Sequence, residues 1–170
     1  MNIVSFILIQ ICNTTKSGTI NSLHLPNASI GGVGLLLSSK AMDNLSNIER
    51  ISSRIIIVDF VGNPKSTVIS CYIPNNSSSD VDINDFYNGL RSVMENVPAH
   101  NFLTIPGDFN AKLGLDDAKF TSHTETNRNG ELLVDFMEEF NLFPANTKFM
   151  KSKNKLWTFK YHNGARAQLD

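Results

Sequence analysis

The sequence predicts a mixed α/β fold in which a mainly antiparallel sheet packs under helices. Strand-like runs rich in β-branched residues outnumber helical ones, and turns built from Gly, Asn and Pro join several runs into hairpins. Two segments with helical spacing of apolar residues lie between strands. Because hairpins pair strands antiparallel, a mixed or mainly antiparallel sheet is favoured over a doubly wound parallel one.

The composition is that of one globular domain, which we expect to cover residues 1–170. The chain is 41% hydrophobic and 18% charged, and no repeat or low-complexity tract divides it. Its formal net charge is −1, so a nucleic acid would have to be held by a local cluster of cations. Cys12 and Cys71 are too few for a disulfide framework or a zinc site, and we expect buried, reduced thiols in an intracellular protein.

The opening segment, residues 2–12, predicts a buried strand. Its apolar run is too short to cross a bilayer. It also lacks the basic region and the small-residue cleavage site of a secretory signal. We therefore expect a protein that is neither secreted nor inserted in a membrane.

Three further strands are expected before the first helix, at residues 32–37, 54–61 and 67–73. The turn sequence at 62–65 makes the last two a hairpin. Pro74 ends this hairpin, and a polar loop follows it.

Two helices are predicted from apolar residues that recur every three or four positions. The first covers 83–97, with Asp80 or Asp82 as its cap and Pro98 as its terminator. The second opens near Asn129, which we interpret as a helix cap rather than a site residue. The apolar stripes are Ile83, Phe86, Leu90, Val93, Met94 and Val97, and then Leu132, Leu133, Phe136, Met137 and Phe140.

Residues 102–106 predict a buried strand that runs directly into a polar motif. Two more strands are expected at 155–159 and from 168 to 170, the last being cut off at its first residues. We interpret Trp157 as a core residue rather than a base-stacking platform.

The motif Gly107-Asp108-Phe109-Asn110 is the strongest candidate for chemistry. On an extended chain, side chains two positions apart share a face, so Asp108 and Asn110 should project together. Gly107 would let a ligand or another backbone come close. A carboxylate can hold a hard cation or orient water, and a carboxamide can donate to a phosphate oxygen. Local hydrogen bonding in a turn remains the alternative interpretation of both residues.

The order of these motifs resembles the endonuclease/exonuclease/phosphatase superfamily. It is most similar to the endonuclease domains of non-LTR (LINE-like) retrotransposons and to derived proteins such as the craniofacial development protein 2-like group. The resemblance implies a four-layered α/β sandwich of two mixed sheets with outer helices, and cleavage of phosphodiester bonds in DNA with Mg²⁺ or Mn²⁺. The motifs that carry it are Gln10 on a strand, 32–37, Cys71-Tyr72-Ile73-Pro74, 107–111, Asn127-Arg128-Asn129-Gly130, Trp157-Thr158-Phe159 and Gln168-Leu169-Asp170.

The resemblance also implies roles for individual residues. Asp108 would position or deprotonate the attacking water and help to hold metal, and Asn110 would steady the phosphate. Tyr72 would contact the scissile phosphate or metal-bound water. Thr158 would lie on the phosphate side, and Asp170 would ligate metal or orient a catalytic histidine. A further candidate is Asn75, as a substrate-binding residue on the loop after Pro74.

Purely structural roles could also account for several of these residues. Tyr72 and Thr158 both suit a strand for reasons of β-propensity alone. Lys151, Lys153 and Lys155 could follow a nucleic-acid backbone, although a solvated loop explains them equally well.

The sequence departs from the family pattern at the metal site. Where the family has Gln-Glu, with the glutamate as the main metal ligand, this chain has Gln10 followed by Ile11. The family's catalytic histidine would fall after Asp170. We therefore expect an incomplete domain with weak or lost activity, located in the nucleus or the cytoplasm. The alternative function is a non-catalytic remnant that at most binds nucleic acid or a protein.

Overall fold

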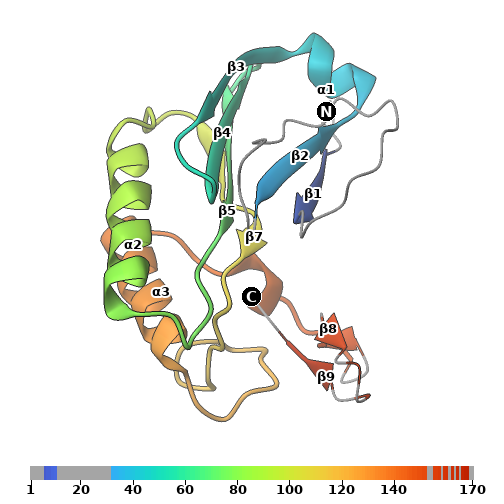
Figure 1. Ribbon diagram of the computed structural model, residues 1–170. Helices are drawn as coiled ribbons and strands as arrows, with labels where there is room; N and C mark the ends of the chain where they lie inside the picture. Colours follow the sequence, from blue (N-terminus) through green and yellow to red (C-terminus); the bar gives the residue numbers. More distant parts are fainter. Residues whose placement is uncertain are drawn as a thin grey trace. The chain divides into compact units, whose positions relative to one another are not determined.

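The computed structural model describes residues 6–10, 32–152, 155–157, 159–160, 162, 164 and 166–168. It confirms the mixed α/β class (Figure 1). The elements in chain order are β1 (Phe6–Gln10), β2 (Val33–Leu37), α1 (Ser39–Asp43), β3 (Leu45–Arg50), β4 (Ile55–Phe60), β5 (Ser66–Tyr72), α2 (Asp80–Glu95), β6 (Phe102–Thr104), β7 (Gly107–Asp108), α3 (Arg128–Glu139), the 3-10 helix η1 (Ala145–Thr147), β8 (Phe159–Lys160) and β9 (Arg166–Ala167).

The chain divides into two compact units. The first unit consists of Met1–Tyr72 and Asn88–Gly107, and the second of Ile73–Tyr87 and Asp108–Asp170. The backbone passes between them after β5, within α2 and within β7. The candidate site motif Asp108-x-Asn110 therefore belongs to the second unit.

A mixed sheet organises the first unit. In the described part of the chain its order is β3-β4-β5-β6, with β7 paired to β5. Strands β3, β4 and β5 are antiparallel neighbours, and Ile57 lies opposite Ile69 in the predicted hairpin. Strand β6 runs parallel to β5, because the intervening helix α2 returns the chain to the same end of the sheet.

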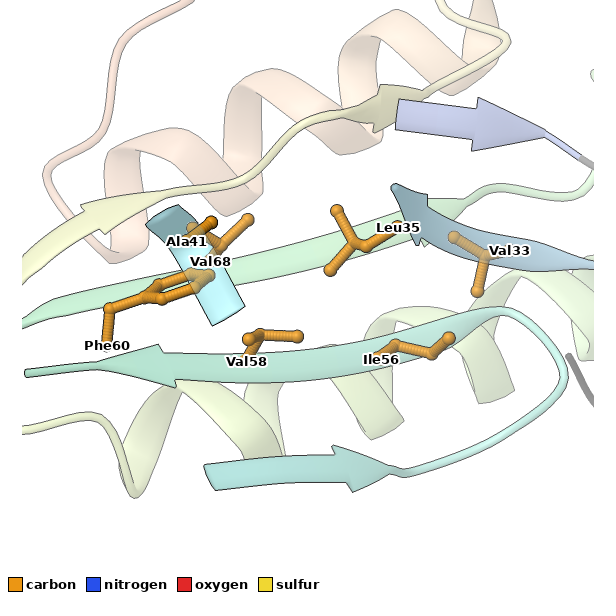
Figure 2. Close-up of a cluster of buried hydrophobic side chains, with 7 residues drawn as sticks. All are labelled: Val33, Leu35, Ala41, Ile56, Val58, Phe60 and Val68. Carbon is orange, nitrogen blue, oxygen red and sulfur yellow. The ribbon is translucent and has the colours of Figure 1, made fainter. Parts of the chain in front are cut away.

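A buried apolar cluster of the first unit lies between β2 and the β4–β5 hairpin (Figure 2). Alternation along β4 directs Ile56, Val58 and Phe60 to one face, where they meet apolar residues of β2, α1 and β5. Strand β1 pairs antiparallel with β2, so that Gln10 lies opposite Val33. The full four-layered sandwich stays a prediction.

The strands predicted before the first helix are confirmed as β1, β2, β4 and β5, and β5 begins and ends one residue earlier than its expected range of 67–73. Helix α1 and strand β3 were not predicted from the sequence. Helix α1 is a single short turn, capped by Ser38, whose Oγ accepts from the Ala41 amide at 3.2 Å. The side chains of β3 do not alternate between buried and exposed, so its sequence lacks the two-residue period of a half-buried strand.

Helix α2 is confirmed, but its predicted cap is wrong. Ser79 caps it, since Ser79 Oγ accepts from the amide of Asp82 at 3.1 Å and donates to the Asp82 carboxylate at 2.6 Å. Asp80 and Asp82 instead lie in the first turn, where their negative charges interact favourably with the dipole of the helix. Neither α2 nor any other helix within the described ranges is long and apolar enough to cross a membrane.

The predicted buried strand at 102–106 is shorter and more exposed than expected. Strand β6 ends at Thr104, and the side chain of Phe102 is 63% exposed. The reason is position: in the described sheet β6 is the last strand, paired on one side with β5. An apolar run cannot reveal whether its strand lies at an edge or in the centre.

The strand predicted at 155–159 is only partly confirmed. Strand β8 begins at Phe159, and residues 155–157 form no strand. Trp157 is 38% exposed, so its assignment to the core is wrong. The segment predicted at 168–170 begins with Gln168, which follows β9 and is buried. Its last residues, like Thr158, lie outside the described residues.

Gly107 sets where the site motif leaves the sheet. The Cys71 amide donates to the carbonyl of Pro106 at 3.1 Å, which brings the two backbones together. A Cβ on Gly107 would lie 2.8 Å from Cys71 Sγ and closer still to the Cys71 carbonyl oxygen. Of the two uses expected for this glycine, the structure shows close approach of another backbone. Cys71 is buried, as expected.

We predict that Gly107→Ala lowers the free energy of unfolding by about 1–3 kcal/mol, because the added methyl group overlaps the Cys71 backbone. Urea denaturation followed by circular dichroism measures the change. The matched control is Gly89→Ala in α2, where a Cβ would meet only Ile55 Cδ1, at 3.8 Å. That substitution should stabilise the protein by about 0.5–1 kcal/mol through helix propensity. Equal stability of Gly107→Ala and the unsubstituted protein would contradict the clash.

Candidate active site

Asp108 and Asn110 form a tight turn at the end of β7. Asp108 Oδ1 accepts a hydrogen bond from the amide of Asn110 at 3.0 Å. Asn110 has a φ of 49°, in the left-handed region that Asn tolerates better than most residues. The expectation that an extended backbone aligns the two side chains is therefore wrong, because the chain turns before Asn110. The local turn bonding that was left open as an alternative is present.

The turn leaves part of each side chain available for other partners. Asp108 Oδ2 accepts no hydrogen bond from the residues that the structure describes. The Asn110 amide nitrogen donates to the carbonyl of Ile73 at 2.8 Å, which uses one of its two N–H groups. Both residues are partly exposed. One carboxylate oxygen and one amide N–H can thus still meet a ligand.

Ile73 fixes this turn at the end of β5. Its own amide donates to the Asp108 carbonyl at 3.0 Å, while its carbonyl receives the Asn110 side chain. Ile73 is fully buried, which anchors both bonds in the interior of the second unit. The turn is consequently held to Ile73 by two bonds, one from the Asp108 carbonyl and one from the Asn110 side chain.

Asn129 joins the same turn to the loop after β5. Its side-chain nitrogen donates to the carbonyl of Pro74 at 2.9 Å and to the carbonyl of Asn110 at 3.3 Å. Its backbone amide donates to Asn76 Oδ1 at 3.1 Å. The side chain is completely buried, and its Oδ1 has no hydrogen-bond partner within the described part. One buried amide therefore holds two site segments that are distant in the sequence.

The start of α3 places Asn129 in this position. The cap of α3 is Asn127, whose Oδ1 accepts from the amides of Gly130 at 2.8 Å and Lys112 at 3.0 Å. The interpretation of Asn129 as the cap is wrong, because Asn127 has the extended backbone that a cap needs and Asn129 lies inside the first turn. Gly130 allows this packing, since a Cβ there would lie 2.6 Å from Thr126 Cγ2.

Arg128 braces the far end of the same loop. Its guanidinium donates to the carbonyl of Ser78 at 3.0 Å and forms an ion pair with Asp80. The Asp80 side chain is 83% exposed, so we assign this pair an orienting role rather than a large contribution to stability. From the sequence, Arg128 was only part of a motif, and Asn129 was interpreted as a helix cap. Their backbone partners, some fifty positions away, leave no signal in a single sequence.

Asn75 lies on this loop, and its side chain is occupied mainly by local bonds. Its Oδ1 accepts from the Ser77 amide at 3.2 Å, from Ser77 Oγ at 2.7 Å and from Ser78 Oγ at 3.2 Å. Such a turn leaves only the Asn75 amide N–H groups for a substrate. Its predicted binding role stays a prediction, and it would have to be that of a donor.

Tyr72 belongs to the first unit, where its ring has structural contacts. It packs against the buried cluster, and the Arg54 guanidinium carbon lies 5.1 Å from the ring centroid. Arg54 Nη1 also donates to the Tyr72 carbonyl at 3.3 Å. These contacts account for a strand aromatic without a catalytic role, so the phosphate contact stays a prediction. Ile11, Thr158 and Asp170 lie outside the described residues.

The described donor set does not complete a site for Mg²⁺. Asp108 supplies one carboxylate, and the residues that the structure describes contain no group of three acidic, histidine or cysteine side chains able to hold a metal ion. Mg²⁺ requires near-octahedral oxygen coordination, which one carboxylate and the neighbouring amides do not provide. The described residues therefore do not form a Mg²⁺ site by themselves.

The architecture is that of an endonuclease domain. It matches the solved structure of the endonuclease domain of TRAS1, a telomere-specific non-LTR retrotransposon, with a TM-score of 0.64 over 96% of this chain and 69% of that one. The sequences are 15% identical, so this likeness concerns the fold alone. It agrees with the mixed α/β class expected from the sequence.

The family follows from the sequence match. The family model described as Endonuclease-reverse transcriptase matches residues 66–164, and the chain belongs to this family. It is also 29% identical over 146 residues to Craniofacial development protein 2 of Tragulus javanicus and of Bos taurus, across 82% of this chain. The chain spans about a quarter of the length of these relatives. The resemblance inferred from the motifs is confirmed.

We predict that Asn129→Ala lowers the free energy of unfolding by about 1–3 kcal/mol, because the carbonyls of Pro74 and Asn110 lose the donor that they share. Urea denaturation measures the effect. The control is Asn96→Ala, which removes an exposed bond to the Ser92 carbonyl and should change stability by less than about 0.5 kcal/mol. Equal effects of the two substitutions would show that Asn129 does not hold the site together.

Proposed function

We propose that this domain derives from a DNA endonuclease that hydrolyses phosphodiester bonds, and that its activity in this chain is weak or lost. The observation that best supports this function is the Asp108–Asn110 turn, anchored by Ile73 and Asn129 in a chain of an endonuclease family. Mg²⁺ or Mn²⁺ is the proposed cofactor. A DNA substrate would be met in the nucleus or the cytoplasm.

The free atoms of the turn suit attack on a phosphodiester. The substrate carries a negative charge that repels an anionic nucleophile, so catalysis needs both an oriented water and donors for the developing charge. Asp108 Oδ2 would accept a proton from water and aim its oxygen at phosphorus. The second N–H of Asn110 would donate to a phosphate oxygen without adding repulsive charge.

Further roles are proposed for four other residues. Tyr72 would offer its hydroxyl to the scissile phosphate, and Asn75 would donate to a neighbouring phosphate. Thr158 would supply another hydroxyl on the phosphate side. Asp170 would add a second carboxylate for metal or orient a histidine. These assignments rest on the family resemblance of each position.

The replacement of glutamate by Ile11 is the reason to propose impaired activity. An alkyl group cannot bind a cation, and losing one charged member of a catalytic unit can abolish most of the rate. The second candidate function is therefore a non-catalytic domain that binds nucleic acid or a protein.

We predict that Ile11→Glu raises Mg²⁺-dependent nicking of supercoiled plasmid by about 10²-fold, because it returns a carboxylate ligand to the metal site. EDTA should abolish the gained activity. Gel electrophoresis of relaxed and supercoiled DNA measures nicking. If Ile11→Glu gains nothing over the unsubstituted chain, the non-catalytic candidate is favoured.

The role of Asp108 is tested in the same background. Asp108→Asn keeps an oxygen acceptor for the Asn110 amide, so the turn survives while the charge is lost. We predict that Ile11→Glu with Asp108→Asn returns to the nicking rate of the unsubstituted chain. The control Asp116→Asn, at an exposed carboxylate, should leave nicking unchanged. Undiminished nicking after Asp108→Asn would remove Asp108 from the mechanism.

A further inference from the structure

A group of exposed aromatic and lysine side chains lies in the second unit, away from any role assigned above. We define the lysine–aromatic surface as Lys119, Phe120, Phe143, Lys148 and Phe149. Phe143 is 62% exposed and Phe149 is 69% exposed, and Met150, next in the chain, is 80% exposed. Large apolar side chains gathered at one place on a surface indicate a binding site more often than single ones do.

Hydrogen bonding holds the two parts of this surface together. The amide of Phe120 donates to the carbonyl of Thr147 at 3.2 Å, which places residues 119–120 beside the end of η1. Lys119 Nζ lies 5.4 Å from the ring centroid of Phe120, and Lys148 Nζ lies 5.2 Å from that of Phe143. The two lysine–ring pairs therefore lie on segments that are more than twenty positions apart in the sequence and are joined by this backbone hydrogen bond.

One of the two segments of this surface is basic, whereas the segment of Lys119 also carries Asp116 and Asp117. The formal net charge of the protein is −1, yet residues 140–157 contain four lysines and no carboxylate. Among the described residues, no carboxylate forms an ion pair with Lys119, Lys148 or Lys151. These cations remain available for an anionic partner.

We infer that the lysine–aromatic surface binds single-stranded nucleic acid. Exposed rings can stack on bases, whose faces are accessible in a single strand and covered in a duplex. Lysines beside the rings would meet the phosphates that alternate with those bases. An anionic strand with flat apolar faces is complementary to both features of the surface. A duplex would use the lysines alone and leave the rings without partners.

This inference rests on the proposed function and deepens it. It names the form of nucleic acid that the domain holds. Binding can be measured in EDTA, where no metal-dependent cleavage takes place. Failure of the nuclease proposal and failure of this inference are thus separate results.

The experiment is fluorescence anisotropy of a labelled twelve-nucleotide thymidine strand, titrated with the complete chain in EDTA. We expect Phe143→Ala and Phe149→Ala each to weaken binding by about 5- to 100-fold, the loss of one stacked base. Lys148→Gln should reduce the slope of log affinity against log salt by about 0.7. A duplex of the same length should bind more weakly than the strand.

The first unit offers matched controls. Phe102 is 63% exposed, so Phe102→Ala removes an aromatic side chain of the same exposure as Phe143. Lys65→Gln removes an exposed lysine. Both control variants should bind the strand as the unsubstituted protein does. Urea denaturation of every variant separates lost binding from lost folding.

Three results would overturn the inference. Unchanged affinity in Phe143→Ala and Phe149→Ala would exclude stacking. Equal weakening by Phe102→Ala would exclude a role specific to this surface. Light scattering that shows dimers disrupted by Phe149→Ala, with strand binding unaffected, would assign the surface to self-association.

Discussion

The demand of buried carbonyl groups for hydrogen-bond donors shapes the candidate site. The carbonyls of Ile73, Pro74 and Asn110 lie where the chain leaves regular strand pairing, so neighbouring strands do not supply their donors. Two carboxamide side chains, those of Asn110 and Asn129, supply them instead. Because each amide has two N–H groups, Asn129 satisfies two carbonyls from different loops. The geometry of the site follows from this shared donor.

The same bonds explain how Asp108 and Asn110 can combine a structural role with the catalytic role proposed for them. Asp108 uses one oxygen to close the turn, and Asn110 uses one N–H to reach Ile73. The remaining oxygen and the remaining N–H keep fixed directions because the first bonds hold the side chains. Turn formation and chemistry are therefore compatible roles for this motif. A preorganised donor and acceptor pair needs such anchoring to act on a developing charge.

Much of the fold could be predicted because it depends on local patterns. A few neighbouring residues are enough to predict the β-branched strand β4, the turn after it and the apolar stripe of α2. The site could be predicted as a motif but not as a geometry. The left-handed backbone of Asn110 and the burial of Asn129 depend on partners far along the chain. The edge position of β6 likewise depends on distant parts of the chain, and for this reason Phe102 is exposed where a buried strand was expected.

Fold and chemistry place different demands on this sequence. The fold matches an endonuclease domain at only 15% identity, so it tolerates replacement of most side chains. A metal site tolerates far less, since Ile11 cannot serve in place of a carboxylate ligand. The domain can consequently lose catalysis while its anchored turn and its lysine–aromatic surface remain, and binding functions can outlast the chemistry.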